Sequence, residues 1–267
     1  MFHGLDNRYL YVAYRVVASF ENDVGDKKDT TGTGFFVING KGQLCFVTNR
    51  HVDLAYNDIE YMNFGLRRVT LHGKGPAGAD KRPDLDQEII FTNPKFVFSS
   101  RYENDIACVI APTARFTGSS NIEYPVTYDF LAKEADFEDK LLVCDFVAFP
   151  GFPPWYDQCS RRPILRTGTI ASDPRYDYSW TAEFKGQCLA YEAFSFGGSS
   201  GSPVFAVEKG PKPGPGISFS GYRELMMIGI NAGHLPMERN QHSGISYLYK
   251  STAIVELVDG GATGAAP

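Results

Sequence analysis

The feature that most constrains this chain is a recurrence of short strand-like runs about ten residues apart. The runs are rich in β-branched and aromatic residues, and clusters of Gly, Pro, Asn or Asp separate them. This spacing is typical of β-sandwiches and β-barrels, so the sequence predicts an all-β fold. The expected strands lie within Tyr9–Phe20, Gly34–Ile38, Leu44–Thr48, Ile89–Phe91, Ile106–Ile110, Leu141–Phe149, Ile164–Ala171, Val204–Val207 and Met226–Asn231.

Helical patterns are few. Ser251–Asp259 has an apolar face and is followed by Gly260 as a stop, which predicts a short C-terminal helix, and Asp129–Phe137 is a weaker second candidate. Two polar stretches, His72–Gln87 and Glu208–Tyr222, are predicted to be surface loops and are candidate regulatory or recognition surfaces.

Composition excludes several classes of protein. Of the 267 residues, 43% are hydrophobic, which is enough for a packed core and argues against a disordered chain. There are 26 Lys and Arg against 31 Asp and Glu, so no basic field is present to bind nucleic acid. No apolar run approaches the roughly 18 residues that span a membrane, and residues 1–8 do not follow the pattern of a signal peptide. We therefore expect a cytoplasmic protein without nucleic-acid or membrane partners.

The cysteines are odd in number and widely spaced. They stand at positions 45, 108, 144, 159 and 188, and no CxxC motif occurs. A disulfide framework or a zinc site would require pairs at closer, regular spacing. The sequence thus predicts reduced thiols and no metal or cofactor.

Three residues stand at the ends of predicted strands with side chains that carry chemistry. His51 follows a strand in LCFVTNRHVDLA, Asp105 precedes one in ENDIACVIAP, and Ser200 lies in the loop FSFGGSSGSPVF. Each one alone has an ordinary structural explanation, as a strand-end histidine, a turn aspartate or a residue of a flexible loop. Together they supply the groups of a nucleophilic hydrolase.

The chemistry of acyl transfer requires these residue types. A serine hydroxyl needs a base to accept its proton, and imidazole titrates near neutrality and can later return that proton to the leaving amine. A carboxylate fixes the imidazole tautomer and stabilises the imidazolium. The glycines around Ser200 let the backbone N–H groups of Gly198 and Ser200 point toward one position and form an oxyanion hole.

The motifs around these residues resemble those of trypsin-like serine peptidases. They are TGTGFFV (31–37), TNRHV (48–52), NDIACV (104–109) and GSSGSPVF (198–205). IGIN (228–231) and GISYL (244–248) are similar to the strands after the nucleophile in HtrA-type and glutamyl-endopeptidase members. The resemblance extends from about residue 9 to residue 258.

The resemblance implies two packed six-stranded antiparallel β-barrels and a short C-terminal helix. The expected divisions are an N-terminal barrel over residues 1–115 with His51 and Asp105, a connection over 116–133, a second barrel and terminal helix over 134–259 with Ser200, and a flexible tail over 260–267. A polar, turn-rich stretch at Pro112–Pro125 supports a connection there.

The resemblance also implies a serine endopeptidase that forms an acyl-enzyme with a protein or peptide substrate. His51 would be the general base, Asp105 its orienting group and Ser200 the nucleophile, with no cofactor. A regulatory partner is not specified. Ser199 stands where digestive members have the Asp that binds a new N-terminus, so we expect activity without N-terminal cleavage. Val52 replaces the disulfide cysteine beside the histidine, and the peptide-binding module of HtrA-type proteins is expected to be absent.

The P1 side chain is the substrate side chain immediately before the scissile bond. The resemblance implies, from position relative to Ser200, which residues surround it. These S1 residues are Phe194, Ser195, Asn231, Ala232, Gly233, His234 and Gly244. They include no carboxylate, so a P1 Arg or Lys would be buried without a counter-charge. Phe194 at the floor favours small or medium apolar P1 residues. An acidic preference would need His234 and His242, which we expect to be exposed loop residues.

Other interpretations fit fewer residues. GGSSG (197–201) matches the nucleophile elbow of α/β-hydrolases with Ser199 as nucleophile, but Pro203 and a short strand follow where that fold needs a helix. The GTG at 32–34 lacks the third glycine and the helix of a dinucleotide loop. A protease fold retained as a binding module with little turnover is the remaining alternative.

Overall fold

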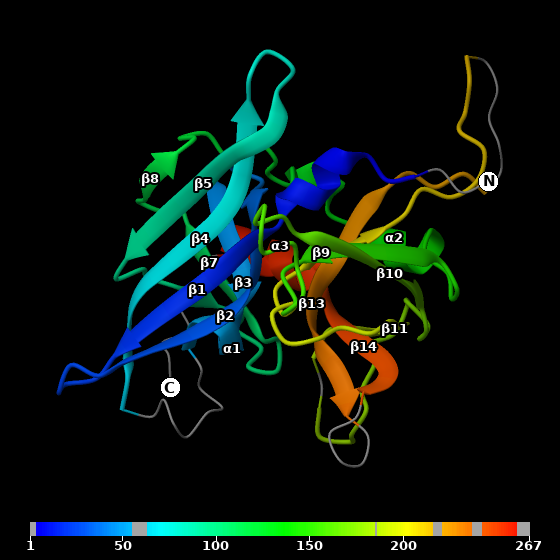
Figure 1. Cartoon of the computed structure of the whole chain (residues 1–267). Helices are drawn as coiled ribbons and strands as arrows, with labels where there is room; N and C mark the ends of the chain where they lie inside the picture. The colour runs from blue at the N-terminus through cyan, green and yellow to red at the C-terminus, as the bar shows by residue number, and fades with distance from the viewer. Residues whose placement is uncertain (1–3, 55–62, 185, 216–220, 237–241, 261–267) are drawn as a thin grey trace.

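The computed structural model (Figure 1) describes residues 4–54, 63–184, 186–215, 221–236 and 242–260. Its first half is an eight-stranded antiparallel sheet in the order β6-β7-β3-β2-β1-β4-β5-β8. The strands are β1 (Tyr14–Glu21), β2 (Lys27–Ile38), β3 (Leu44–Asn49), β4 (Gly65–Ala77), β5 (Arg82–Thr92), β6 (Val97–Phe98), β7 (Ile106–Ile110) and β8 (Arg115–Gly118).

The second half is a closed barrel of six strands. Its order is β10-β11-β14-β13-β12-β9, and every neighbouring pair is antiparallel. The strands are β9 (Phe146–Gly151), β10 (Ile164–Ile170), β11 (Cys188–Glu192), β12 (Pro203–Ala206), β13 (Met226–Pro236) and β14 (His242–Lys250). The expected six-stranded barrel is therefore present in this half, whereas the first half is a larger sheet and not the second six-stranded barrel of the prediction.

Short helices connect and cover these sheets. They are the 3-10 helices η1 (Asn7–Val12) and η3 (Tyr128–Phe130) and the α-helices α1 (Arg50–Leu54), α2 (Glu134–Asp139) and α3 (Ser251–Gly260). The predicted C-terminal helix is confirmed by α3, which packs against strands of both halves (Figure 1). The weaker helical prediction at Asp129–Phe137 corresponds to two shorter pieces, η3 and α2.

Three local predictions differ from the structure. The run Tyr9–Phe20 is not one strand, because the Asp6 carboxylate accepts a hydrogen bond from the N–H of Arg8 (2.9 Å) and caps η1 before β1 begins. His72–Gln87 is no loop but the end of the β4–β5 hairpin. Leu141–Phe149 becomes a strand only from Phe146.

The hairpin and the sheet edge have clear physical causes. In β4 the buried Lys74 pairs with Asp86 of β5 at 2.6 Å, so polar side chains here support a ladder instead of a loop. β8 pairs with β5 through Ile89↔Phe116, so the sheet continues to Gly118, beyond the expected boundary at residue 115.

The described part of Glu208–Tyr222 has no named strand or helix, as predicted for a loop. The tail at 261–267 lies outside the described residues.

Three hydrophobic clusters form the core. One cluster packs on the eight-stranded sheet and includes Phe36, Phe46 and Phe91. A second cluster lies inside the barrel and includes Phe149, Tyr191 and Leu248. The remaining cluster joins the two halves, and we call this contact the seam. Its residues include Phe35, Val37, Cys45, Val47, Ile106 and Cys108 of the sheet, Phe205, Met227, Ile230 and Tyr249 of the barrel, and Ile254 and Leu257 of α3.

All five cysteines fall within the described residues and are free thiols, with Cys45, Cys108 and Cys188 buried and Cys144 and Cys159 exposed. Within the described residues, no helix has the length and apolar character that crossing a membrane requires.

Candidate active site

His51 and Asp105 are paired directly at the seam. The β3–β7 register aligns Asn49 with Ile106, so the residue before β7 lies beside the start of α1. The N–H of His51 donates to Asp105 Oδ1 at 2.9 Å, and its Nδ1 lies 2.5 Å from Oδ2. The Asn49 amide donates to the Asp105 carbonyl at 2.8 Å and holds the same peptide from the other side.

This pairing fixes the tautomer of the imidazole. A carboxylate only accepts hydrogen bonds, so Nδ1 of His51 carries the hydrogen and Nε2 is left with a lone pair. The side chain of His51 is 33% exposed and that of Asp105 is 13% exposed. The imidazole is thus accessible from solvent while the carboxylate that it contacts is shielded.

The Ser200 loop is joined to the first half beside α1. The N–H of Thr33 in β2 donates to the Ser200 carbonyl at 2.7 Å. A Cβ placed on the preceding Gly32 would lie 2.7 Å from Val52 Cγ2 and 3.2 Å from the Ser200 carbonyl oxygen. Gly32 therefore lies between Ser200 and the residue that follows His51, and all three predicted catalytic residues gather at this part of the seam.

The hydroxyl of Ser200 faces β13. It donates to the carbonyl of Ala232 at 3.4 Å, which is a long and weak bond. The hydrogen bonds of the described residues do not include one between Ser200 and His51. Such contacts often form only when a substrate is bound, and rotation about one side-chain torsion changes the direction of a serine hydroxyl.

The turn that carries Ser200 has a backbone conformation that requires glycine. Gly198 has φ +84°, and a Cβ there would come within 2.4 Å of the Phe152 carbonyl oxygen. Gly201 has φ +88° and packs as tightly against the Thr33 carbonyl. Positive φ and close backbone approach are tolerated by glycine alone at such positions.

This turn leaves two backbone donors without acceptors. The N–H groups of Ser199, Gly201 and Ser202 are bonded within the protein. Across the described part of the chain, the N–H groups of Gly198 and Ser200 have no acceptor. Two free donors beside a serine hydroxyl are what a developing oxyanion needs.

Asn231 and Ser195 serve the framework of the site. The amide of Asn231 accepts from Tyr191 Oη (2.6 Å) and donates to the Ser199 carbonyl (2.8 Å), and the side chain is buried. Ser195 is also buried and bonded to Ser246. Of the predicted S1 residues, these two have their polar atoms occupied within the protein.

The histidines near the site are not the exposed loop residues of the prediction. His234 in β13 and His242 in β14 are half-buried and stacked, with ring centroids 4.2 Å apart. Phe194 is 53% exposed and its ring lies 4.9 Å from that of His242. Gly244 has φ +87° and donates its N–H to His242 Nδ1 at 2.8 Å.

Three residues near these histidines were not predicted from the sequence, namely Arg166, Phe196 and Trp155. Arg166 lies in β10, where the alternating pattern of ILRTGTI gave no indication of which side faces the barrel interior. The register with β9 was the missing information, because it pairs Arg166 with the buried Phe149.

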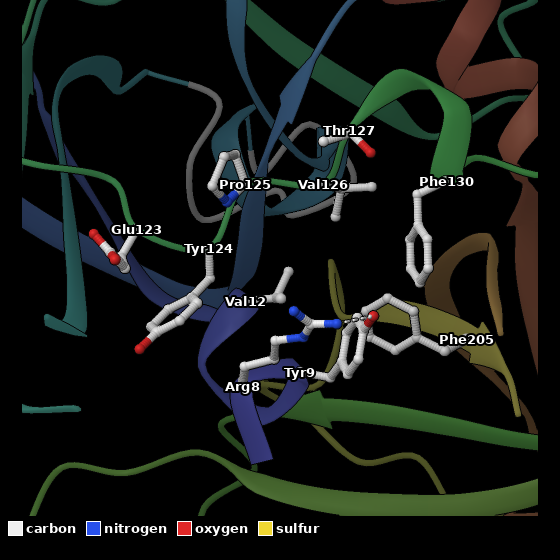
Figure 2. A pocket seen from close by; sticks show the side chains of 10 residues that line it. All are labelled: Arg8, Tyr9, Val12, Glu123, Tyr124, Pro125, Val126, Thr127, Phe130 and Phe205. Carbon is white, nitrogen blue, oxygen red and sulfur yellow. Dashed lines mark hydrogen bonds between the residues drawn. The ribbon is translucent and has the colours of Figure 1, made fainter. Parts of the chain in front are cut away.

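A separate cavity of about 430 Å³ lies between η1, the connection and β12 (Figure 2). Tyr9, Phe130 and Phe205 form aromatic walls, and Arg8 and Glu123 also line it. None of the predicted catalytic residues lines this cavity. Throughout the described residues, no group of three or more His, Cys, Asp or Glu could hold a metal ion.

Neither a protein-family model nor a curated protein matches the chain. Among solved structures, the chain is similar to the thermostable serine protease AL20 from an extremophilic microorganism. The identity is 11% and the TM-score 0.49, over 97% of this chain and 100% of the other.

Proposed function

We propose that the protein is a serine endopeptidase that hydrolyses peptide bonds through an acyl-enzyme. The observation that carries this proposal is the two-bond pairing of His51 with Asp105, beside a glycine turn with two free N–H donors. These are the parts of a His-Asp-Ser triad and an oxyanion hole.

The reaction would begin at Ser200. Its hydroxyl turns from the Ala232 carbonyl, gives its proton to Nε2 of His51 and attacks the substrate carbonyl carbon. The carbonyl oxygen becomes negative and accepts hydrogen bonds from the N–H groups of Gly198 and Ser200. Asp105 stabilises the imidazolium that has formed.

Collapse of this intermediate would complete the first half of the reaction. The C–N bond breaks, and the leaving amine takes the proton from His51. Water then gives a proton to Nε2 and attacks the acyl-enzyme ester. The ester C–O bond then breaks, the proton on His51 passes to Ser200 Oγ, and the carboxylic acid product is released. Apart from the substrate and one water molecule, these steps use only side chains and backbone N–H groups of this chain.

A fluorophosphonate probe tests the nucleophile directly. We expect one covalent label on the wild-type chain, located at Ser200 by mass spectrometry, and none on Ser200→Ala. Ser200→Ala and His51→Ala should lower kcat on a peptide substrate by roughly 10⁴- to 10⁶-fold. Asp105→Asn should lower it by about 10⁴-fold, because the wrong tautomer is then presented.

Ser199→Ala is the matched control, because Ser199 is the neighbouring serine and its hydroxyl has no hydrogen-bond partner among the described residues. We expect this variant to keep its label and its activity. Loss of labelling in Ser199→Ala but not in Ser200→Ala would instead favour the nucleophile-elbow interpretation. A folded wild-type chain that takes no label would favour a binding module.

A further inference from the structure

Arg166 directs a positive charge into the end of the barrel. It pairs with Phe149 across β10 and β9, and cross-strand partners project from the same face of a sheet. Phe149 belongs to the barrel core and contacts Tyr191 edge-on at 5.6 Å. The half-buried guanidinium lies 4.8 Å from the ring centroid of Phe196 and 5.9 Å from that of Trp155.

This cation has no anionic partner among the described residues. Some other arginines of the chain are paired, such as Arg162 with Asp84 and Arg175 with Asp173. No ion pair of Arg166 occurs in the described structure, and burial lowers its pKa. A partly buried, unpaired charge is unfavourable for the folded chain, so its presence needs a reason beyond packing.

Two histidines lie near Arg166, and we call Arg166, His234 and His242 the basic cluster. The ring of His242 lies 5.7 Å from Phe196, and His234 is stacked on it. Because Nδ1 of His242 accepts from the Gly244 N–H, Nε2 carries the hydrogen in the neutral ring and acts as a donor. Burial, together with the charges of His234 and Arg166, lowers the pKa of His242. Among the described residues, the charged groups that act on this imidazole are thus those of His234 and Arg166, and both are basic.

Two segments connect the cluster to the proposed nucleophile along the chain. Phe196 lies in the same loop as Ser200, four residues before it. His234 follows two residues after Ala232, whose carbonyl holds the Ser200 hydroxyl. These segments are the ones expected to surround the P1 side chain.

We propose that Arg166, assisted by His242 and His234, binds an acidic P1 side chain, so that cleavage occurs after Glu or Asp. This assignment rests on the proposed peptidase function and replaces the apolar P1 preference expected from sequence. A guanidinium forms two parallel hydrogen bonds with a carboxylate, and it also packs favourably on aromatic rings. The same cluster repels a P1 Arg or Lys.

The test compares peptides that differ only at P1, as Glu, Gln, Leu or Lys. Glu and Gln have nearly the same shape, so their kcat/KM ratio isolates the charge. We expect the wild type to favour Glu over Gln by on the order of 100-fold. In Arg166→Gln the ratio should fall to near 1, and Arg166→Lys should keep part of it. Arg175→Gln, an exposed arginine far from Ser200 in sequence, is the control and should keep the full ratio.

The outcomes separate the two proposals. A wild-type ratio near 1, or an equal loss on all four peptides in Arg166→Gln, would overturn the role of Arg166. The fluorophosphonate probe carries no acidic P1 group, so Ser200 should still be labelled in Arg166→Gln. Absence of labelling in the wild type would instead overturn the peptidase proposal. If Arg166→Gln does not fold, the wild-type ratio and the Arg166→Lys ratio still decide.

Discussion

Asn104 and Gln187 exchange two hydrogen bonds across the seam. The Asn104 Nδ2 donates to Gln187 Oε1 at 2.7 Å, and the Gln187 N–H donates to Asn104 Oδ1 at 2.9 Å. Asn104 is buried directly before Asp105, and Gln187 is buried directly before β11. The position of the Asp105 carboxylate, which belongs to the sheet, is therefore tied to the barrel.

Asn104→Ala should lower kcat by roughly 10-fold or more with little change in KM, because Asp105 would lose its support and His51 its orientation. Leaving the buried Gln187 groups unpaired should also cost about 1–3 kcal/mol of stability. Steady-state kinetics and thermal unfolding measure both. Asn22→Ala removes three exposed hydrogen bonds of the β1–β2 turn and is the control for kcat, which it should leave unchanged. A destabilised Asn104→Ala with normal kcat would show that the pair acts on stability alone.

Thr33 supports the turn that contains the two free donors. Its hydroxyl donates to the Gly198 carbonyl at 2.7 Å and accepts from the Phe152 N–H at 3.2 Å. Thr33→Val keeps the shape and removes both bonds. We expect kcat to fall by about 10-fold, because a shifted Gly198 N–H stabilises the oxyanion less well. Binding of a peptide aldehyde, which forms the tetrahedral adduct, should weaken by a similar factor.

Thr33→Ser retains the hydroxyl and should restore both values. Equal effects on the aldehyde and on KM for the peptide would argue against a role in the oxyanion hole, since a general loss of binding affects both.

Asp53 makes stability depend on pH. It is fully buried in α1, and neither carboxylate oxygen has a hydrogen-bond partner among the described residues. Burial and, secondarily, the charge of Asp105 raise its pKa well above the ordinary value. The folded chain thus holds this proton more tightly than the unfolded chain. Stability from Asp53 is present at acidic pH and is lost as pH rises through the raised pKa.

Asp53→Asn should remove the loss of folding stability that ionisation of Asp53 causes at higher pH. We expect its Tm to exceed that of the wild type at pH 8, and the difference to shrink toward pH 4, where both forms of the protein carry a neutral side chain here. Asp139→Asn, at an exposed position in α2, should show no such trend. A parallel pH dependence of wild type and Asp53→Asn would contradict the buried-charge explanation.

The free thiols predict how the protein responds to reduction and alkylation. A strong reductant should leave Tm and activity unchanged, since no cysteine is in a disulfide. Iodoacetamide on the native chain should modify Cys144 and Cys159 alone, the two exposed thiols. Intact mass before and after unfolding counts the modified sites. A fall in Tm on reduction would reveal a bridge.

The candidate site could be predicted from sequence because its residues have distinctive local surroundings. His51 follows a buried strand, Asp105 precedes one, and Ser200 lies between glycines that a tight turn requires. Strand ends and glycine turns are visible in a single sequence. The apolar face of α3 was visible for the same reason.

Features that depend on the register between paired strands could not be predicted from the sequence. Polar residues at His72–Gln87 resemble a loop until Lys74 is seen opposite Asp86. Arg166 resembles any exposed strand residue until its pairing with Phe149 directs it inward. A shift of one residue reverses every side chain of a strand, and pairing partners distant in sequence decide it.

The seam would also make the proposed hydrolysis a reporter of how the two halves are docked. His51 and Asp105 come from one half and Ser200 from the other, and the shared cluster of Phe35, Phe205 and their neighbours holds them together. A small separation there would stop turnover while each half still kept its strands. In a urea titration, activity should be lost before circular dichroism changes. Coincident loss would mean that the halves separate and unfold in one cooperative step.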